Sequence, residues 1–384
     1  MDDNKLFSLY SIIPFRSSFL KYTKARKAYL YYENYRINLL TGLTEDQGVS
    51  VLFNELEKSE FKDHFFFHAF YELGHLFINT KIDLSDEPLG ILIEYDHVQE
   101  VKSLGKQNEK VCLDWENVGL NSYRDAFEKG YKHIKRGDCY QYNLTFLFEG
   151  NIKGSAFSFA KKLWKNTDHR GAYGHFTYSS FLEKGFLSNS PECLFQIRKD
   201  RVFTMPIKGT IACEDSEIEV KTKVLSKSSK DESELFMITD LLRNDLNVLS
   251  NLGAKVILKK SFLKVPKLLH TYSLISSQYE NQTLYTILKS LFPGGSITGA
   301  PKKRVVEIIQ DIEQGSRGFY CGSTVIKSKN IFASSINIRS AVIDEKLNKI
   351  FYGAGGGITF DSSCEGEYSE MVLKRDSFSS LIEE

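Results

Sequence analysis

Long apolar runs are missing from this 384-residue sequence, and so is a targeting segment at its start. No stretch approaches the roughly 18 consecutive apolar residues that a membrane-spanning helix needs. The first residues, MDDNKLFSLYSIIPF, are acidic at the start and contain neither the basic segment nor the long apolar segment of a secretory signal. These absences predict a soluble cytoplasmic protein without a membrane partner.

Paired cysteines and an excess of one charge are missing as well. The six cysteines are scattered with no CxxC pair, which is typical of reduced thiols and not of a disulfide framework or a zinc knuckle. The 50 lysines and arginines nearly balance the 49 aspartates and glutamates. A balanced charge gives no reason to expect binding to nucleic acid or to an anionic membrane surface.

Linkers, low-complexity tracts and internal repeats are also absent, so the sequence shows no clean domain boundary. The composition, 42% hydrophobic and 26% charged, is that of an ordinary globular protein with a sizeable core. We therefore predict a single domain over residues 1–384. Residues 1–115 differ from the rest because they are rich in aromatic residues and lysine.

Helical and strand-like periods are both present. Apolar residues at helical spacing begin near Tyr123, Asp231, Pro301 and Cys364. Gly137 and Gly315 are suited to follow the ends of the first and third of these helices. Strand-like runs include KAYLYYENYRINLL, LGILIEYDHV, FLSNSPECLFQI, RVFTMPIKGT, STVIKS, FASSINIRSAVI and KIFYGAGGGITF. Strand groups mixed with long helices, without strict βαβ alternation, predict an α+β fold.

The stretch FPGGSITGAPKKR at 292–304 combines three glycines with a following helix start. Such a backbone can approach a ligand closely, and the helix terminus offers unpaired N–H groups to an anion. Ala300 and Pro301 stand where a nucleotide-binding P-loop needs Lys and Ser or Thr, so the P-loop interpretation is weak. A plain glycine turn before a capped helix stays open as the alternative.

Carboxylates gather in the last predicted helix. Glu367 and Glu370 are three residues apart and share a helical face with Lys374. Two carboxylates so placed can hold a hard cation such as Mg²⁺. Glu234, near the start of another helix, is a third candidate. A solvated helix face, or a favourable charge near a helix N-terminus, explains the same residues without a metal.

Lys208 lies in the apolar stretch TMPIKGTIA, which indicates the end of a buried strand. Because burying an unpaired ammonium is costly, Lys208 either extends to water or serves a cleft that needs an amine. Arg339, in SINIRSAVI, suits bidentate binding of a carboxylate, and an edge-strand salt bridge is the equal alternative. Glu192, in SNSPECLF, is by itself an ordinary turn carboxylate.

Three histidines lie near one another in DHFFFHAFYELGH, at positions 64, 68 and 75, with Glu72 between them. Two of the imidazoles could share a helical face. There is no HExxH motif, and the neighbouring phenylalanines favour core packing or surface exposure over a metal site.

The order of the motifs is more specific than any one of them. The sequence contains, in turn, SPE (190–192), PIKGT (206–210), DLLRNDL (240–246), FPGGSITGAPK (292–302), RGFYCG (317–322), INIR (336–339), GAGGGI (353–358) and EYSE (367–370). This series resembles the chorismate-utilising enzyme family, which contains anthranilate synthase component I, aminodeoxychorismate synthase component I, and the isochorismate and salicylate synthases. The resemblance is close over the core motifs, residues 120–375, and loose over residues 1–115.

The resemblance implies an anthranilate synthase component I-like fold, in which two antiparallel β-sheets pack face to face with helices outside. The active site would lie in the cleft between the sheets. Mg²⁺ would be coordinated by Glu234 and Glu370, with Glu367 helping directly or through water, and would hold the ring carboxylate of chorismate. The other carboxylate would be bound by Tyr320 and Arg339, with help from Ser296, Gly355 and Gly357. Lys374 would face the metal-bound carboxylate.

The resemblance also assigns chemical roles. Glu192 would be the general acid and base, and His270 would lie near the ring. Lys208 separates sister enzymes, because anthranilate synthases resemble PIAGT at this position and aminodeoxychorismate synthases resemble PIKGT. In the latter, the lysine is thought to attack the ring at C2 and form a covalent intermediate. A desolvated lysine has a lowered pKa and is a usable nucleophile.

The expected reaction is therefore amination of chorismate by ammonia to 4-amino-4-deoxychorismate, the precursor of 4-aminobenzoate and folate. The sequence carries no glutaminase signature, and the resemblance implies that a separate glutamine amidotransferase subunit would supply ammonia. Anthranilate synthase component I, or an isochorismate or salicylate synthase, is the enzyme alternative. A catalytically silent protein that binds chorismate or a partner is the alternative of another class. Asn247 and Val248 replace the usual Gly-Arg after RNDL, and no tryptophan-binding signature is visible.

Overall fold

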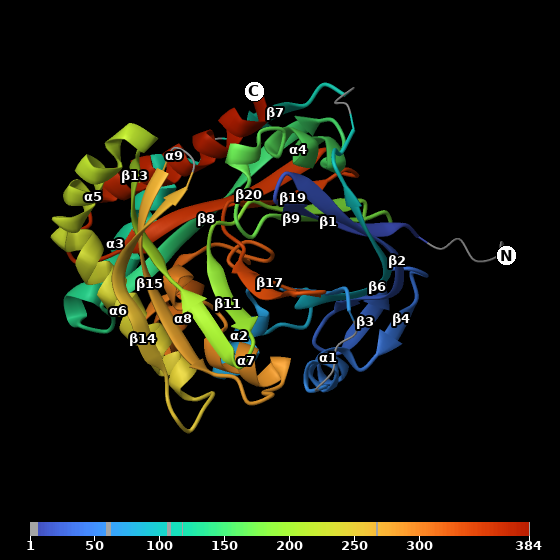
Figure 1. Ribbon diagram of the computed structural model, residues 1–384, viewed down its shortest axis with the longest axis horizontal. Helices are drawn as coiled ribbons and strands as arrows, with labels where there is room; N and C mark the ends of the chain where they lie inside the picture. Colours follow the sequence, from blue (N-terminus) through green and yellow to red (C-terminus); the bar gives the residue numbers. More distant parts are fainter. Residues whose placement is uncertain (1–6, 59–62, 106–108, 117, 266–267, 384) are drawn as a thin grey trace.

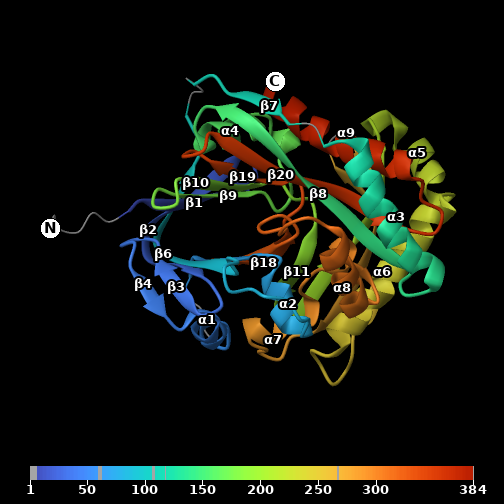
Figure 2. The same cartoon turned by 180° about the vertical axis from the view of Figure 1, so that it is seen from behind.

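The computed structural model describes residues 7–58, 63–105, 109–116, 118–265 and 268–383. The acidic start of the chain, residues 1–6, on which part of the targeting prediction depends, lies outside these ranges. Figures 1 and 2 show strands in the interior and helices around them, as an α+β fold requires. No helix in the described ranges combines the length and the apolar character needed to span a membrane.

The strands form a continuous antiparallel sheet whose two halves share β2 (Ser18–Tyr31). The first half runs from β2 through β1 (Leu9–Phe15), β9 (His175–Ser179), β10 (Lys184–Ser188), β19 (Ser340–Asp344) and β20 (Lys349–Ile358) to β8 (Gln141–Lys153). The second half runs through β6 (Gly90–Val101), β5 (Phe65–Ala69), β17 (Ser323–Ser328), β18 (Ile331–Ile336), β11 (Cys193–Arg198) and β12 (Arg201–Met205) to β15 (Leu268–Gln278).

Shorter strands extend both halves. They are β3 (Tyr35–Asn38), β4 (Thr44–Asp46), β7 (Cys112–Trp115), β13 (Ile207–Ala212), β14 (Lys255–Val265) and β16 (Gly299–Ala300). The α+β prediction is confirmed. The expectation of two sheets needs one refinement, because β2 is long enough to pair with β1 and β3 along one edge and with β6 along the other. The two layers are therefore halves of one sheet.

The helices cover the outside of this sheet. They are α1 (Gly48–Leu56), α2 (Leu73–Ile78), α3 (Leu120–Arg136), α4 (Ala156–Leu163), α5 (Ile218–Ser226), α6 (Ser229–Asn247), α7 (Leu284–Leu291), α8 (Lys302–Ile312) and α9 (Cys364–Glu383). The 3₁₀ turns are η1 (Thr167–His169), η2 (Asp215–Glu217) and η3 (Gly295–Ile297). On the first half, α9 packs on β20, while α3 and α8 pack on β8. On the second half, α6 packs on β13, β14 and β15.

The predicted helix ends agree closely with the observed ones. Helix α3 ends at Arg136 and is followed by Gly137 with φ 78°, a left-handed conformation that glycine adopts without strain. Helix α8 begins at Lys302 with Pro301 as its cap, one residue later than predicted. Each half of the sheet buries its own apolar cluster beneath its helices, with Phe148, Tyr352 and Met371 in the first. Because each half is filled by its own apolar cluster, space for a ligand is expected where the two halves meet.

The histidine-rich stretch is partly strand and not one helix. His68 lies on β5 and is fully buried, with its ring nitrogens 2.9 Å from the hydroxyls of Thr324 and Thr177. His75 lies on the separate helix α2. The idea that two of these imidazoles share a helical face is therefore wrong, because His64 precedes β5, His68 lies on it and His75 lies on another element. Of the two favoured interpretations, core packing and surface exposure, core packing holds for His68 and His75.

Candidate functional site

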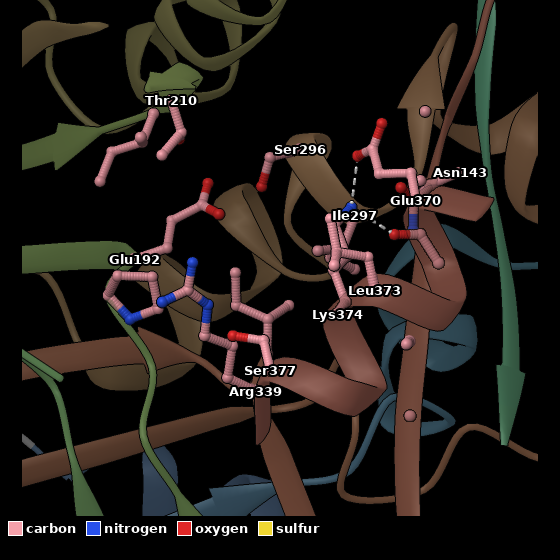
Figure 3. A pocket seen from close by; sticks show the side chains of 18 of the residues that line it. Asn143, Glu192, Thr210, Ser296, Ile297, Arg339, Glu370, Leu373, Lys374 and Ser377 are labelled. Carbon is pink, nitrogen blue, oxygen red and sulfur yellow. Dashed lines mark hydrogen bonds and ion pairs between the residues drawn. The ribbon is translucent and has the colours of Figure 1, made fainter. Parts of the chain in front are cut away.

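A cavity of about 580 Å³ lies between the two halves of the sheet. It is lined from one side by β8, β20 and α9, and from the other by β13, β15 and α6, with η3 and the loops before β11, β17 and β19 completing the wall. All twelve predicted site residues line it: Glu192, Lys208, Glu234, His270, Ser296, Tyr320, Arg339, Gly355, Gly357, Glu367, Glu370 and Lys374. Figure 3 shows the side chains of this wall. Residues up to 182 positions apart in sequence thus reach one space.

A β-bulge aims Lys208 at the cavity. The apolar stretch around Lys208 is divided at Pro206 into β12 and β13, so Lys208 is the second residue of a strand and not, as predicted, at the end of one. On β13, the pairing with β15 changes register between Lys208 and Thr210. Gly209 between them has φ 70°, a conformation that side-chain-bearing residues rarely adopt. Such bulges redirect side chains beside functional sites.

The Lys208 side chain is largely shielded from water, and its amine has a partner. Its Nζ lies 3.7 Å from Oε2 of Glu234 on α6, and the two side chains are only 17% and 16% exposed. Of the two alternatives left open by the sequence, the structure therefore favours the amine in a cleft.

Glu192 is a buried carboxyl group in the loop between β10 and β11. Its Oε1 has no hydrogen-bond partner among the described residues, and neither has Oγ of Ser296 on η3. In Figure 3, the Glu192 carboxylate and the Ser296 hydroxyl extend toward each other at the cavity wall. Burial raises the pKa of Glu192, while Ser296 and the Lys208 cation act in the opposite direction. A carboxyl group with a raised pKa holds its proton more readily and is suited to act as a general acid.

His270 on β15 presents a neutral imidazole. Burial and the nearby Arg339 cation lower the pKa of His270 to about 4. Its Nδ1 lies 2.8 Å from Oγ1 of Thr210. Fixed by this contact, the ring can supply a hydrogen bond or a polar surface to a ligand without adding charge.

Arg339 and Tyr320 are donors suited to a carboxylate. Arg339 lies between β18 and β19 with φ 51°, again in the left-handed region. Arg339 lines the cavity and forms no ion pair among the described residues, so the predicted alternative of an edge-strand salt bridge does not hold in the described part of the chain. The ring of Tyr320 lies over Gly353, where a Cβ atom would be 2.1 Å from ring carbons. Burial holds the pKa of Tyr320 well above its usual range, so its hydroxyl remains a donor.

Backbone donors come from the glycine run of β20. Strand β19 pairs with β20 only up to Tyr352, so the following residues leave that edge open. On the other edge, Gly355 lies opposite Thr145 of β8, whose N–H donates instead to Oε1 of Glu313 at 2.7 Å. In an antiparallel ladder, a residue that does not bond across its pair turns its N–H and C=O away from the partner strand. Gly355 thus points them toward the open edge.

Gly357 repeats this arrangement two residues later. It lies opposite Asn143, whose N–H donates to the carbonyl of Thr298 at 2.7 Å. The backbone groups of Gly357 therefore also face the open edge beside the cavity. Two aligned N–H groups give an anion the kind of cradle that the resemblance implied.

The carboxylates of α9 converge on the same strand. A Cβ atom at Gly356 would lie 3.1 Å from Oε2 of Glu367 and 3.9 Å from Oε1 of Glu370. Lys374 donates from Nζ to Oε1 of Glu370 at 2.8 Å and to the carbonyl of Gly355 at 2.7 Å, as Figure 3 shows for the ion pair. Lys374 thus joins α9 to the glycine run.

The metal prediction fits in part. Among the described residues, no three carboxylate, imidazole or thiol groups lie close enough together to enclose a metal ion. Glu234 contacts Lys208 and does not join Glu367 and Glu370. The α9 pair nevertheless suits Mg²⁺, which is usually held by one or two carboxylates together with water and oxygens of the substrate.

The balance of charge in the cavity supports the same cation. Five carboxyl groups line the cavity, from Asp231, Glu192, Glu234, Glu367 and Glu370. Three cationic side chains line it, from Lys208, Arg339 and Lys374. Like charges brought together in a low-dielectric space repel strongly. A dianionic ligand therefore needs a further cation, or bound protons, to enter this cavity.

Six polar residues that line the cavity were not predicted: Asp231, Asn143, Asn189, Thr210, Tyr352 and Ser377. Asp231 precedes Glu234 by three residues on α6, which is the same helical spacing that drew attention to Glu367 and Glu370. Thr210 belongs to the PIKGT motif. Asn143 and Asn189 carry no signal in sequence, because they reach the cavity only through the pairing of β8 and through the loop before β11.

Comparison with known proteins gives a consistent result. The family model described as chorismate binding enzyme matches residues 61–380. The chain is 35% identical to aminodeoxychorismate synthase component 1 of Escherichia coli over 279 residues, which are 68% of this chain and 58% of that protein. It is 32% identical to the Klebsiella aerogenes protein of the same name, over 79% of this chain and 74% of that one. The match thus spans little more than half of the E. coli relative.

Solved structures agree on the fold. The anthranilate synthase component I of Streptococcus pneumoniae superimposes with a TM-score of 0.79 over 96% of this chain and 93% of that one, at 21% identity. The predicted anthranilate synthase component I-like fold is thereby confirmed.

Proposed function

Because the chain belongs to the chorismate-binding enzyme family, we propose that it aminates chorismate at C4 to give 4-amino-4-deoxychorismate. The observation that carries this proposal is Lys208, whose amine lies in the family's cavity within 3.7 Å of Glu234. A nucleophilic amine in a partly dry cleft is what a covalent amination route needs. The relatives named aminodeoxychorismate synthase component 1 support the same assignment.

Chorismate is a dianion, and the cavity offers complementary donors for each carboxylate. Arg339 and Tyr320 suit the pyruvyl carboxylate, because the guanidinium is unpaired in the described part of the chain and the hydroxyl stays protonated. The backbone N–H groups of Gly355 and Gly357 and the hydroxyl of Ser296 add donors that orient the ring. Mg²⁺ held by Glu367 and Glu370 would neutralise the ring carboxylate, and Glu234 remains a third candidate ligand.

Lys208 would begin the chemistry as a free amine. The Glu234 carboxylate, 3.7 Å from Nζ, can accept the proton that Lys208 must lose. The Lys208 nitrogen then bonds to C2, the ring double bonds shift, and the C4–O bond breaks. Glu192 donates a proton to the departing hydroxyl group, which leaves as water.

Ammonia completes the exchange. Its nitrogen bonds to C4, the double bonds shift back, and the C2–N bond to Lys208 breaks. Glu192, now ionised, accepts a proton from the incoming nitrogen. Chorismate and ammonia thus give 4-amino-4-deoxychorismate and water, with no change of oxidation state. Two successive displacements allow the amine to enter on the carbon that the hydroxyl group left.

The ammonia would come from a separate glutamine amidotransferase, as the designation component 1 of the relatives suggests. The product would serve as precursor of 4-aminobenzoate and folate, and the enzyme would work in the cytoplasm.

The test is direct. The purified chain is incubated with chorismate, Mg²⁺ and excess ammonium, and the product is identified by mass and by conversion with a coupled lyase. We expect 4-amino-4-deoxychorismate. Anthranilate would instead assign the chain to the anthranilate synthases, isochorismate or salicylate to those synthases, and no turnover despite chorismate binding to a silent binding protein.

A further inference from the structure

Three of the sequence motifs contain charged residues that do not line the cavity. Asp245 belongs to DLLRNDL, Lys302 to FPGGSITGAPK and Arg317 to RGFYCG. Each is largely buried: the side chains of Asp245, Lys302 and Arg317 are 16%, 11% and 4% exposed. Burying charges requires well-placed partners, and even then rarely gives a fold its best stability. These residues therefore need another explanation.

Arg317 donates four hydrogen bonds from its guanidinium group. Its Nη2 and Nε donate to the two carboxylate oxygens of Glu313 at 2.7 and 2.8 Å. Its Nη1 donates to the carbonyl of Ile297 on η3 at 2.7 Å, and Nη2 also donates to the carbonyl of Asn143 on β8 at 2.7 Å. Ile297 and Asn143 both line the cavity. Arg317 thus holds two cavity walls from behind.

Glu313 extends this support along β8. Its Oε1 accepts from N–H and Oγ1 of Thr145, at 2.7 and 3.0 Å. Because the Thr145 N–H donates to Glu313, it does not bond to Gly355, which lies opposite it on β20. The N–H and C=O groups of Gly355 therefore point toward the open edge of β20. The Arg317–Glu313 pair therefore occupies the place of a neighbouring strand along this part of β8.

The second buried ion pair joins Lys302, which directly follows the loop 292–301, to Asp245 on α6. Nζ of Lys302 donates to Oδ2 of Asp245 at 2.6 Å and to the carbonyl of Leu291 at 3.3 Å. Ser290 donates from its hydroxyl to the carbonyl of Asp245. The start and the end of the loop are thereby tied to helix α6.

We propose that these two buried ion pairs position the loop 292–301 for the reaction, and in particular set the Ser296 hydroxyl opposite Glu192. Lys302 and Asp245 hold the two ends of the loop, and Arg317 holds its middle at Ile297. Arg317 and Lys302 are then positioning residues that act through Ser296 without touching substrate. The inference rests on the proposed function for the nature of the substrate.

A double-mutant cycle between Arg317→Lys and Ser296→Ala tests the proposal. Lysine keeps the charge of Arg317 but cannot make the fork of bonds to Glu313, Ile297 and Asn143. In the otherwise native enzyme we expect Arg317→Lys to lower kcat/KM about 10- to 100-fold, since small misplacements in an active site have such effects. In the Ser296→Ala background the same change should cost less than about 3-fold, because the hydroxyl group through which it acts is gone.

Arg36→Lys is the matched control. Arg36 also pairs by two nitrogens with one carboxylate, that of Glu45, but on β3, away from the cavity. We expect kcat/KM to be unchanged in this variant. Equal losses from Arg317→Lys in both backgrounds, or a fall in melting temperature with normal kinetics, would show that Arg317 is merely structural.

The cycle is also measured on the dissociation constant for chorismate with Mg²⁺, by calorimetry. If the native enzyme binds chorismate but does not aminate it, the proposed function fails while the binding cycle still decides whether Arg317 acts through Ser296. If Arg317→Lys does not fold, Lys302→Met takes its place in the same cycle. Additive effects there would overturn the proposal, and non-additive effects would support it.

Discussion

Single residues set the chemistry of the cavity in this protein, and Lys208 and Glu192 illustrate two ways of doing so. The Lys208 amine lies beside a carboxylate with its side chain 17% exposed, and Glu192 is buried with one oxygen unsatisfied among the described residues. Lys208 thus presents an amine in the wall of the cavity. Glu192 holds a proton more tightly than an exposed carboxylate would.

Lys208→Ala should abolish amination at C4 while leaving chorismate binding largely intact. Loss of a nucleophile that acts covalently lowers kcat on the order of 10³-fold or more. Product formation is measured by mass, and binding by calorimetry. Lys208→Arg is the matched variant, because it keeps the cation next to Glu234 but cannot act as the nucleophile. An amination rate close to that of the native enzyme in either variant would contradict the covalent role.

Glu72→Gln should remove a pH dependence of stability. Burial raises the pKa of Glu72 to about 7, although it accepts N–H bonds from Arg317 and Gly318. The folded state thus binds the proton more tightly than the unfolded state, so the native protein loses stability as the pH rises from about 4.5 to about 7. The loss has an upper bound of about 3 kcal/mol.

Urea unfolding of both proteins at several pH values measures this difference. The native protein should lose stability relative to Glu72→Gln between pH 5 and 7 and run parallel to it above that window. Parallel curves throughout the window would mean that Glu72 keeps an ordinary pKa in the fold.

The glycines of strand β20 leave its backbone uncovered, so that side chains from other elements can approach it closely. The clearest position is Gly353, which accommodates the ring of Tyr320. Gly356 similarly leaves room for the carboxylates of α9. The strand therefore serves as a surface against which donors and carboxylates are assembled from other elements.

Gly353→Ala should displace Tyr320. The added Cβ would lie 2.1 Å from ring carbons, so the ring must move, and we expect KM for chorismate to rise. Overpacking of this kind also costs about 1–3 kcal/mol of unfolding free energy. Steady-state kinetics and urea unfolding measure the two effects.

Gly119→Ala serves as the comparison, since no atom lies within 4 Å of its added Cβ and its φ is −70°. We expect a change below about 1 kcal/mol and normal KM there. A normal KM in Gly353→Ala would exclude Tyr320 from substrate binding.

The sequence predicted the helices and strands far better than it predicted which side chains and strands contact one another. The helical period around Leu235 and Ile238 predicted α6, and the motif order brought Glu234 into the site. That Glu234 would lie 3.7 Å from Lys208 depends on how β13 and α6 pack, which periodicity does not report. The register shift at Gly209 could not be predicted either. The glycine is visible in PIKGT, but its φ of 70° depends on how β13 pairs with β15.

The whole molecule consists of two halves that share β2 and enclose the cavity between them. The groups proposed to act on the ring come from the second half or from the loop that leads into it. They are Lys208, Glu192 and His270. The proposed carboxylate and metal groups on β20 and α9 come from the first. A bound ligand therefore connects the halves.

Chorismate together with Mg²⁺ should stabilise the protein against heat. At a ligand concentration 100 times the Kd, binding adds about 2.7 kcal/mol to the unfolding free energy, which raises the Tm by several degrees. Chorismate with a chelator should have a much smaller effect, because the carboxyl groups of the cavity outnumber its cations. The measurement is differential scanning calorimetry with each ligand alone and with both. Equal stabilisation with and without the chelator would argue against a metal in the site.

Helix α9 has a consequence for biosynthesis. It supplies Glu367, Glu370 and Lys374, and it spans Cys364–Glu383. During translation, the cavity stays without this wall until those residues have left the ribosome and packed on β20. A chain that ends before residue 364 lacks these three side chains, and it also lacks Met371, Phe378 and Ile382 of the first apolar cluster. The order of residues along the chain thus makes this wall of the cavity a late addition, after β8 and β20 have been synthesised.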